Sequence, residues 1–378
     1  MKKSEAVFAL AKFISPSFND EKALQELLQS VKDEWEIIIQ QANRYLLVPA
    51  LYVSLKEKNI YDMLEDEMLK GYLYEIYTLN KKRNEAILFQ VQELSLELST
   101  IGVTPLLLKG VTALSEHHFS DDGQRSMMDI DIVVPEVKIF EAITLLKSIG
   151  YQEINPLQKL SKHWHHYRRL YKTEGATSVE LHRLISKYKV LKYMLNFNDL
   201  KDTQSAMGID NAKVLSPTYE LYYTFLHSEI GHDYHDKIIT LRHLHHGAVL
   251  ITKYTDMIDF QKIEGYIKKY NLEQVWHEYL WILQKLFFIE IPVSVEPMLT
   301  YEAKVCHNLD TEGSMSWIVK MFIVKMRNVF SFETLQFNYE KLQYPYQLFY
   351  YIPKRFFYLS YKIVTDKSKR KAIMKSLS

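Results

Sequence analysis

Hydrophobic residues recur every three or four positions over most of this chain, a spacing typical of amphipathic helices. Residues 1–80 follow this pattern, and residues 82–100 extend it into one long predicted helix that ends at Gly102. The spacing returns beyond residue 186, where it predicts helices at 219–228, 238–254, 259–270 and 272–288. Both ends of the chain are therefore predicted to be helical.

The middle of the chain has a different pattern, in which short apolar or alternating runs lie between helical segments. After the long helix, the predicted order is strand 103–108, helix 111–119, strand 127–134, helix 135–148 and a hairpin of strands 166–171 and 178–184. This order predicts an α+β fold, in which a small mixed β-sheet is flanked by helical regions. The corresponding domains are an N-terminal helical region at 1–80, a core at 81–185 and a C-terminal helical domain at 186–378.

Composition and charge indicate the environment of the protein but not its partner. The 378 residues include 47 basic and 46 acidic side chains, so the net charge of +1 favours no charged partner. The single cysteine, Cys306, excludes an internal disulfide and a thiolate metal cluster, and it is typical of a reducing compartment. No apolar run reaches the roughly 20 residues that a membrane span needs. We expect a cytoplasmic protein.

Two carboxylates alternate with apolar residues in the predicted strand 127–134. Asp129 and Asp131 are separated by one residue, and alternate residues of a strand face the same side. Lys109 and Gly110 form a predicted turn shortly before this strand. Because Mg²⁺ prefers carboxylate oxygens, the aspartate pair predicts a magnesium site for phosphate chemistry.

The order of several short motifs resembles the uncharacterised nucleotidyltransferase family of the DNA polymerase β superfamily. The motifs are Leu108-Lys109-Gly110, Arg125, Asp129-Ile130-Asp131 and Ser178-Val179-Glu180-Leu181-His182. They lie within residues 82–185, and the helical remainder matches less clearly. The resemblance implies a polymerase β-like nucleotidyltransferase core. It also implies Mg²⁺-dependent transfer of a nucleoside monophosphate from an NTP, such as ATP, to an acceptor hydroxyl with release of pyrophosphate.

Asp129, Asp131 and Glu180 would form the catalytic site implied by this resemblance. Their carboxylates would bind two magnesium ions, and manganese is a possible substitute. Glu180 would lie beside the attacking hydroxyl and accept its proton. His182 shares a strand face with Glu180, and we expect it to be a packed neighbour rather than a catalytic group. The acceptor stays open among small molecules, sugars, proteins and RNA ends.

Lys109, Gly110 and Arg125 would bind the nucleotide. The two basic side chains are candidates for neutralising phosphate charge, and a glycine lets the backbone approach the triphosphate. The helix after Gly110 would add backbone N–H groups at its N-terminus. One residue departs from the superfamily pattern, because Val111 stands where a serine is common and so lacks a hydroxyl that would contact phosphate.

Two other functions are compatible with the aspartate pair. Metal-dependent glycosyltransferases also use Asp-x-Asp to hold a nucleotide-sugar diphosphate, although a longer alternating region of strands and helices usually precedes it. A non-catalytic nucleotide-binding or regulatory module could keep the same nucleotidyltransferase shell, and Val111 favours that alternative slightly.

Histidines outside these motifs suggest a third type of site. The clustered histidines are His163, His165, His166, His227, His232, His235, His243, His245 and His246. Their spacing is compatible with zinc, but no acidic ligand set at metalloprotease spacing accompanies them. We expect them to line the cleft where the helical domain faces the carboxylates.

Residues 344–375 combine basic and aromatic side chains. Such a segment can stack on nucleic acid or lie at an anionic membrane surface. The favoured interpretation is an aromatic helix that packs on the body of the protein, followed by a solvated basic tail.

Overall fold

The computed structural model describes residues 1–156, 166–183, 203–233, 239–330, 335, 339 and 342–365. The chain divides into two compact units. The larger unit consists of residues 1–234 and 239–303, and the smaller unit consists of residues 235–238 and 304–378. All the predicted site residues lie in the larger unit.

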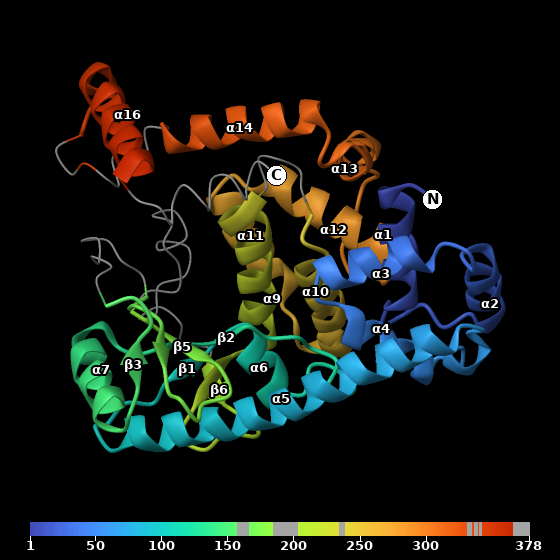
Figure 1. Cartoon of the computed structure of the whole chain (residues 1–378), viewed down its shortest axis with the longest axis horizontal. Helices are drawn as coiled ribbons and strands as arrows, with labels where there is room; N and C mark the ends of the chain where they lie inside the picture. The colour runs from blue at the N-terminus through green and yellow to red at the C-terminus, as the bar shows by residue number, and fades with distance from the viewer. Residues whose placement is uncertain are drawn as a thin grey trace. The chain divides into compact units, whose positions relative to one another are not determined.

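Five α-helices form the N-terminal part of the larger unit (Figure 1). They are α1 (Lys3–Phe13), α2 (Glu21–Ser30), α3 (Trp35–Arg44), α4 (Val48–Glu57) and α5 (Glu67–Ser99), with a 3₁₀ turn at Tyr61–Met63 before α5. The helix predicted to start at residue 82 in fact starts at Glu67. The Asp66 carboxylate caps it by accepting hydrogen bonds from the backbone N–H groups of Met68 and Leu69.

A mixed sheet of seven strands forms the centre of the larger unit. The strands are β1 (Leu106–Leu107), β2 (Asp129–Val133), β3 (Gln152–Glu153), β4 (Leu170–Tyr171), β5 (Ser178–His182), β6 (Thr203–Ser205) and β7 (Lys213–Leu215). Their order is β3-β4-β5-β2-β1-β7-β6. β2 is parallel to β5 and β1 is parallel to β7, whereas the other neighbours are antiparallel. The α+β fold class is therefore confirmed.

The helices predicted between the strands are present as α6 (Gly110–Ser115) and α7 (Ile139–Ser148), the latter after a 3₁₀ turn at Glu136–Lys138. Strands β6 and β7 correct the expectation that the chain beyond residue 186 is entirely helical. Each has only three residues, too few for an alternating pattern to stand out in the sequence. They form because β1 offers a backbone partner to β7, which in turn pairs with β6.

The two faces of the sheet differ because side chains alternate along each strand. Ile130 and Ile132 of β2 join a hydrophobic core with Ile87 and Val91 of α5 and Ile143 of α7. Figure 1 shows α5 extending from the N-terminal helices beneath the sheet, with α7 at its far end. The opposite face of β2 and β5 is left for the acidic side chains.

Four further helices confirm the segments predicted beyond residue 210, with small shifts at their ends. They are α9 (Pro217–Phe225), α10 (Leu241–Tyr254), α11 (Phe260–Lys269) and α12 (Glu273–Phe287). α9 continues as a π-helix over Leu226–Asp233, and a 3₁₀ turn at Thr255–Met257 follows α10. α10 packs against α9, α12 and α1, and α9 also contacts β7 of the sheet.

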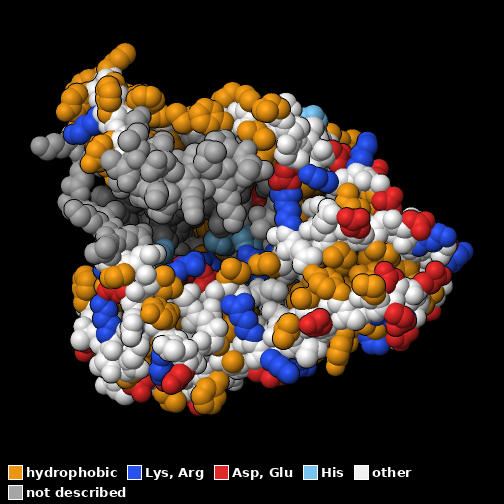
Figure 2. All heavy atoms as spheres, in the orientation of Figure 1, with side chains coloured by type: hydrophobic (Ala, Val, Ile, Leu, Met, Phe, Trp, Pro, Cys, Tyr) orange, Lys and Arg blue, Asp and Glu red, His pale blue; other side chains and the backbone are white. Residues whose placement is uncertain are grey.

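The smaller unit contains α14 (Met315–Val329) and α16 (Leu348–Thr365), with a 3₁₀ turn at Pro345–Gln347, and α13 (Leu299–Thr311) leads into it. α16 is the aromatic helix predicted within residues 344–375, and Figure 2 shows hydrophobic side chains over much of its surface. Residues 366–375 of the predicted basic tail lie outside the described residues. Among the helices described, none is both long and apolar enough to cross a membrane.

Gly247 allows α10 to pack closely on α12. A Cβ atom at this position would overlap the hydroxyl of Tyr279, which has no hydrogen-bond partner in the part of the chain that the structure describes. Gly247→Ala is therefore expected to lower the free energy of unfolding by about 1–3 kcal/mol, the usual cost of overpacking. Tyr279→Phe removes the overlapping oxygen and should restore most of that loss, as measured by urea denaturation. An equal loss in the single and double variants would contradict this account.

Candidate active site

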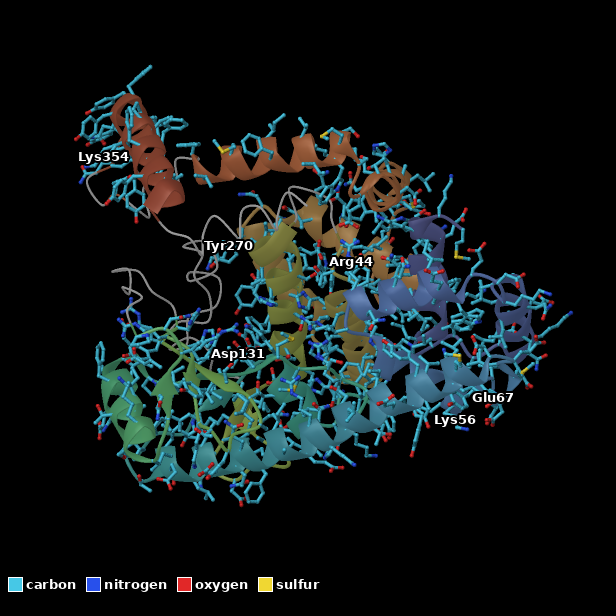
Figure 3. The ribbon with its side chains drawn as sticks, viewed as in Figure 1. Arg44, Lys56, Glu67, Asp131, Tyr270 and Lys354 are labelled. Atoms are coloured by element: carbon cyan, nitrogen blue, oxygen red, sulfur yellow. The ribbon has the colours of Figure 1, made fainter. Side chains whose placement is uncertain are left out.

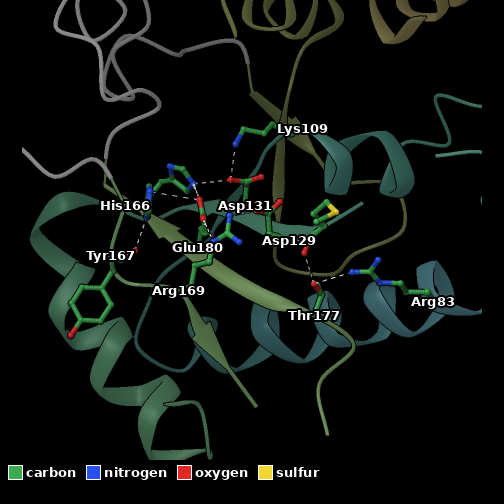
Figure 4. A network of polar contacts seen from close by, with 11 residues as sticks. Arg83, Lys109, Asp129, Asp131, His166, Tyr167, Arg169, Thr177 and Glu180 are labelled. Carbon is green, nitrogen blue, oxygen red and sulfur yellow. Dashed lines mark hydrogen bonds and ion pairs between the residues drawn. The ribbon is translucent and has the colours of Figure 1, made fainter. Parts of the chain in front are cut away.

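Acidic side chains converge on two adjacent parallel strands. β2 pairs with β5 in a register that places Asp131 opposite Glu180. Because alternate residues share a face, Asp129 lies on the same side of β2 as Asp131, and His182 on the same side of β5 as Glu180. The strand pairing thus brings the three predicted acids into one cluster (Figure 4).

Asp131, Glu180 and His182 form a buried group whose geometry could hold a metal ion. Their ligand atoms all lie within 4.8 Å of one another. His182 Nε2 is 2.8 Å from Asp131 Oδ1 and 3.6 Å from Glu180 Oε2. The sequence interpretation treated His182 as a packed neighbour, whereas the fold places its ring nitrogen among the carboxylate oxygens.

Two basic side chains contact the acids (Figure 4). Arg169, just before β4, donates from Nε to Glu180 Oε1 (2.5 Å) and from Nη2 to Asp129 Oδ2 (2.9 Å). Lys109 donates from Nζ to Asp131 Oδ1 (2.8 Å). The sequence analysis missed Arg169. The available signal was a basic residue within the predicted strand 166–171, which was expected to form a hairpin with the strand of Glu180, since cross-strand neighbours of opposite charge attract.

An unusual backbone turn before α6 positions Lys109. Its φ of +59° and ψ of −121° are rarely adopted by a residue with a Cβ atom. The ion pair with Asp131 ties the side chain to β2. Backbone strain of this kind persists where the surrounding structure enforces it, and it is common near functional sites.

Local charges keep two of the acids ionised. Burial favours the neutral form of Asp131, but the charge of Lys109 and the hydrogen bond with His182 outweigh it and hold the pKa of Asp131 below its usual range. Burial likewise opposes ionisation of Glu180, yet its contact with His182 helps to lower the pKa to about 2. The same two acids raise the pKa of His182 against the effect of its burial.

Asp129 behaves differently from its two neighbours. Burial and the negative charges of Asp131 and Glu180 raise its pKa, and Lys109 and Arg169 offset this only in part. The three acids therefore form a cluster in which like charges repel one another, and additional positive charge would stabilise it.

Helices α9 and α10 supply further side chains near the acids. Tyr223 of α9 interacts electrostatically with Lys109 and Asp131, and Arg242 in the first turn of α10 interacts with Asp129. Figure 3 labels Asp131 on the side of the sheet toward α9. The surroundings of the carboxylates therefore include residues from the helical part of the chain beyond residue 186.

The three predicted nucleotide-binding residues take different positions. Lys109 joins the carboxylates. Arg125 is buried and forms no ion pair with an acid among the described residues, and its Nη1 lies 3.5 Å from the carbonyl oxygen of Arg242. Gly110 begins α6, where a Cβ atom would lie 2.7 Å from Met127 Cγ, so the close approach that this glycine allows in the structure is to Met127.

Val111 belongs to the hydrophobic core of the sheet and is 1% exposed. A serine on the same backbone would place its hydroxyl among apolar side chains. In this conformation, the departure from the superfamily pattern therefore removes no polar contact from the carboxylates.

The predicted histidine clusters separate in part, although the rings of His227 and His243 stay in contact, with centroids 5.0 Å apart. His163, His165 and His235 lie outside the described residues. His166 lies next to the acids, with Nε2 3.8 Å from Glu180 Oε2. Within the described part of the chain, none of the histidines on helices belongs to a group that could hold a metal.

His245 and His246 of α10 are buried in the interior and contact groups other than the carboxylates. His245 Nε2 lies 3.0 Å from the carbonyl oxygen of Ile14, and His246 Nε2 lies 3.1 Å from His118 Nδ1. Burial lowers the pKa of His118 and of His245 to about 3 and that of His246 well below its ordinary value. All three rings are therefore neutral at pH 7.

Acidification is expected to destabilise the protein through these buried histidines. The unfolded chain protonates histidine near pH 6.5 and the folded chain only near pH 3, so the unfolded state binds more protons between these values. Each ring should therefore lower the free energy of unfolding by roughly 1 kcal/mol per pH unit below about pH 6.5.

Urea denaturation between about pH 7.5 and 5.5 measures this pH dependence. His245→Gln keeps a donor for the Ile14 carbonyl oxygen but cannot titrate, and it should make the dependence shallower. An unchanged slope in this variant would show that His245 is not one of the responsible groups.

Comparison with known proteins gives the chain a family. The family model described as uncharacterised nucleotidyltransferase matches residues 32–288, more than half of the chain. The matched region contains the sheet, the three acids and helices α9 to α12. No curated protein and no solved structure matches the chain significantly. The resemblance seen in residues 82–185 thus extends into the helices on both sides, and the chain belongs to the uncharacterised nucleotidyltransferase family.

Proposed function

We propose that this protein transfers a nucleoside monophosphate from an NTP to an acceptor hydroxyl, with Mg²⁺ as cofactor and pyrophosphate as the second product. The observation that carries the proposal is the convergence of Asp129, Asp131 and Glu180 on one face of the paired strands β2 and β5. Membership of a nucleotidyltransferase family supports the same chemistry.

The side chains of the cluster suit a divalent metal. Mg²⁺ prefers carboxylate oxygens, and the lowered pKa values of Asp131 and Glu180 keep both in the ligand form at neutral pH. Asp129, Asp131 and Glu180 would hold two ions, and the nitrogen of His182 would make Mn²⁺ acceptable as well. Metal ions in such a site stabilise the charge on the attacking and leaving oxygens of the phosphoryl group.

The basic residues and Glu180 receive separate roles. Lys109 and Arg169 now donate to carboxylates, and both can donate to phosphate oxygens instead, so we assign them to neutralising the nucleotide. Glu180, with a pKa of about 2, is a weak base. We therefore assign it to metal binding and not to uptake of the hydroxyl proton.

Ligand binding tests the substrate class before the acceptor is known. A non-hydrolysable ATP analogue with Mg²⁺ is expected to raise the unfolding temperature, because a ligand at about 100 times its Kd adds about 2.7 kcal/mol of stability. UDP-glucose with Mn²⁺ serves as the comparison and should have no such effect. Stabilisation by UDP-glucose and not by the NTP analogue would instead support the glycosyltransferase alternative.

Turnover separates an enzyme from a binding module. Pyrophosphate release from each of the four common NTPs is measured with a panel of sugar, small-alcohol, protein and RNA acceptors. We expect release that depends on both metal and acceptor. Retained NTP binding with no release against the whole panel would favour the non-catalytic alternative.

A further inference from the structure

Two arginines, one buried and one partly buried, lie side by side next to the carboxylate cluster. Arg125, in the segment before β2, is 7% exposed, and Arg242 is the second residue of α10. Arg125 Nη1 is 3.5 Å from the carbonyl oxygen of Arg242. The Nε atoms of both side chains are buried and have no hydrogen-bond partner among the residues that the structure describes. Neither guanidinium forms an ion pair with an acid in the described part of the chain, and the negative charge that acts on Arg242 from a distance is that of Asp129.

This arrangement is unfavourable for the protein alone. A guanidinium removed from water is destabilising by several kcal/mol unless it is paired, and two like charges add repulsion. Burial and the charge of Arg242 lower the pKa of Arg125, and burial lowers the pKa of Arg242. The backbone N–H groups at the start of α10 add partial positive charge, and no side chain caps them.

Glu220 of α9 does not supply the missing negative charge. It is the acid whose charge acts on Arg125, but neither of its carboxylate oxygens has a hydrogen-bond partner within the described ranges of the chain. Burial raises its pKa to about 8, so the side chain is mostly neutral at pH 7. An anion from outside the chain would balance the two arginines.

We propose that Arg125 and Arg242 together bind the triphosphate of the nucleotide, so that α10 contributes a phosphate ligand to a site whose acids come from the sheet. This inference rests on the proposed function and adds Arg242 to it. Arg242 is adjacent to both parts of the site, because it interacts electrostatically with Asp129 while its carbonyl oxygen faces Arg125. Guanidinium groups donate pairs of hydrogen bonds to phosphate oxygens, and a triphosphate is long enough to contact more than one of them.

Inorganic tripolyphosphate in the absence of metal tests the arginine pair directly, because it carries the phosphates without the nucleoside. In calorimetric titrations of the full chain, Arg242→Gln and Arg125→Gln are each expected to weaken its binding by about tenfold to a hundredfold. Arg83→Gln is the matched control. Arg83 is an exposed arginine of α5 that contacts Thr177, and its replacement should change the Kd by less than about twofold.

The stability of the ligand-free variants gives a second readout with a defined sign. If the two charges are uncompensated, Arg242→Gln should raise the Tm of the ligand-free protein and remove the increase in Tm caused by tripolyphosphate. A purely structural arginine would instead give a lower Tm and unchanged tripolyphosphate affinity, and that result would overturn the proposal. Unchanged affinity in both arginine variants would overturn it as well.

Competition identifies the source of the phosphates. The Mg²⁺ complex of a non-hydrolysable ATP analogue should displace bound tripolyphosphate, whereas a phosphorylated acceptor such as a sugar phosphate should not. The opposite result would overturn the assignment to the NTP.

Two outcomes separate the anion site from the proposed function. Tripolyphosphate binding that depends on the arginines, in a protein without NTP turnover, would support the anion site and contradict the proposed function. Metal-dependent turnover that both arginine variants retain would uphold the function and overturn the anion site.

Discussion

Asp129→Asn is expected to lower metal-dependent NTP turnover by about a thousandfold, comparable to the largest effects of removing one charge-stabilising group from an active site. Asparagine keeps the shape of the side chain but removes one of the three carboxylates proposed to hold the metal ions. The measurement is metal-dependent pyrophosphate release under conditions in which the unchanged protein turns over. Turnover at the original rate would show that Asp129 is not part of the site.

The same substitution should leave the protein folded, which separates its effect on activity from one on stability. Asp129 is the acid whose pKa is raised by burial and by the charges of Asp131 and Glu180. Removing its charge relieves that repulsion, and Arg169 keeps its contact with Glu180. We expect the free energy of unfolding to change by less than about 1 kcal/mol.

Asp62→Asn is the matched control for this substitution. Asp62 is exposed and, among the described residues, forms its ion pair with Lys56, far along the chain from the carboxylates. The Asp62→Asn substitution should leave the rate of turnover unchanged and should alter the free energy of unfolding by less than about 0.5 kcal/mol. A loss of turnover in this control would indicate a general effect of removing an acidic charge.

Asp131→Asn is expected to lower the free energy of unfolding by about 3–5 kcal/mol, the usual cost of removing one partner of a buried ion pair. Asp131 is 3% exposed and contacts both Lys109 and His182. Its replacement removes the acid that accepts the hydrogen bond of the partly buried Lys109 ammonium group and leaves only the more distant charge of Asp129 near it. Urea denaturation at neutral pH gives the value.

The pH dependence of this difference follows from the lowered pKa of Asp131. Because the folded-state pKa lies below the unfolded value, the stabilisation is complete above about pH 4 and is lost as the pH falls further, through the folded-state value. Because Asp131 also raises the pKa of His182, the difference between the two proteins should be largest where His182 is protonated and should become smaller as the pH rises through the pKa of that histidine, while the part due to Lys109 persists. A difference that disappeared completely between about pH 5 and 8 would contradict the assignment.

A double-variant cycle tests whether the charge pair is the cause. Lys109→Met removes the cation and keeps an apolar stem, so Asp131→Asn combined with Lys109→Met should be more stable than the sum of the single effects predicts. Additivity within about 0.5 kcal/mol would show that the two side chains are not energetically coupled.

Helices were the most accurately predicted part of the fold, because each buries one face and repeats its pattern over several turns. The four helices from α9 to α12 appear within a few residues of the predicted segments. The predicted start of α5 at residue 82 was wrong, because the helix begins at Glu67, directly after the Asp66 cap. Strands β6 and β7 were missed because three-residue strands are formed by their neighbours and carry little pattern of their own.

The candidate site shows the same division between local and long-range information. The motif order pointed to Asp129, Asp131, Glu180 and Lys109, and these four side chains lie together in the structure. Arg169 and His182 entered the site through their contacts with the acids. Arg242 could not be recognised in the sequence, because it is one arginine at the start of a helix, and only the tertiary packing of that helix brings its charge near Asp129.

The sequence by itself determined the α+β class, the long helices and the alternation that puts Asp129 and Asp131 on one face of a strand. These properties depend on neighbours within a few residues, where helical and strand periodicities are set by backbone geometry. Only the tertiary structure decided that Asp131 faces Glu180, that Val111 is in the core and that Arg125 lies against Arg242. Strand register and helix packing bring together residues that are far apart in the chain. A local sequence pattern does not show which of these distant residues will be in contact.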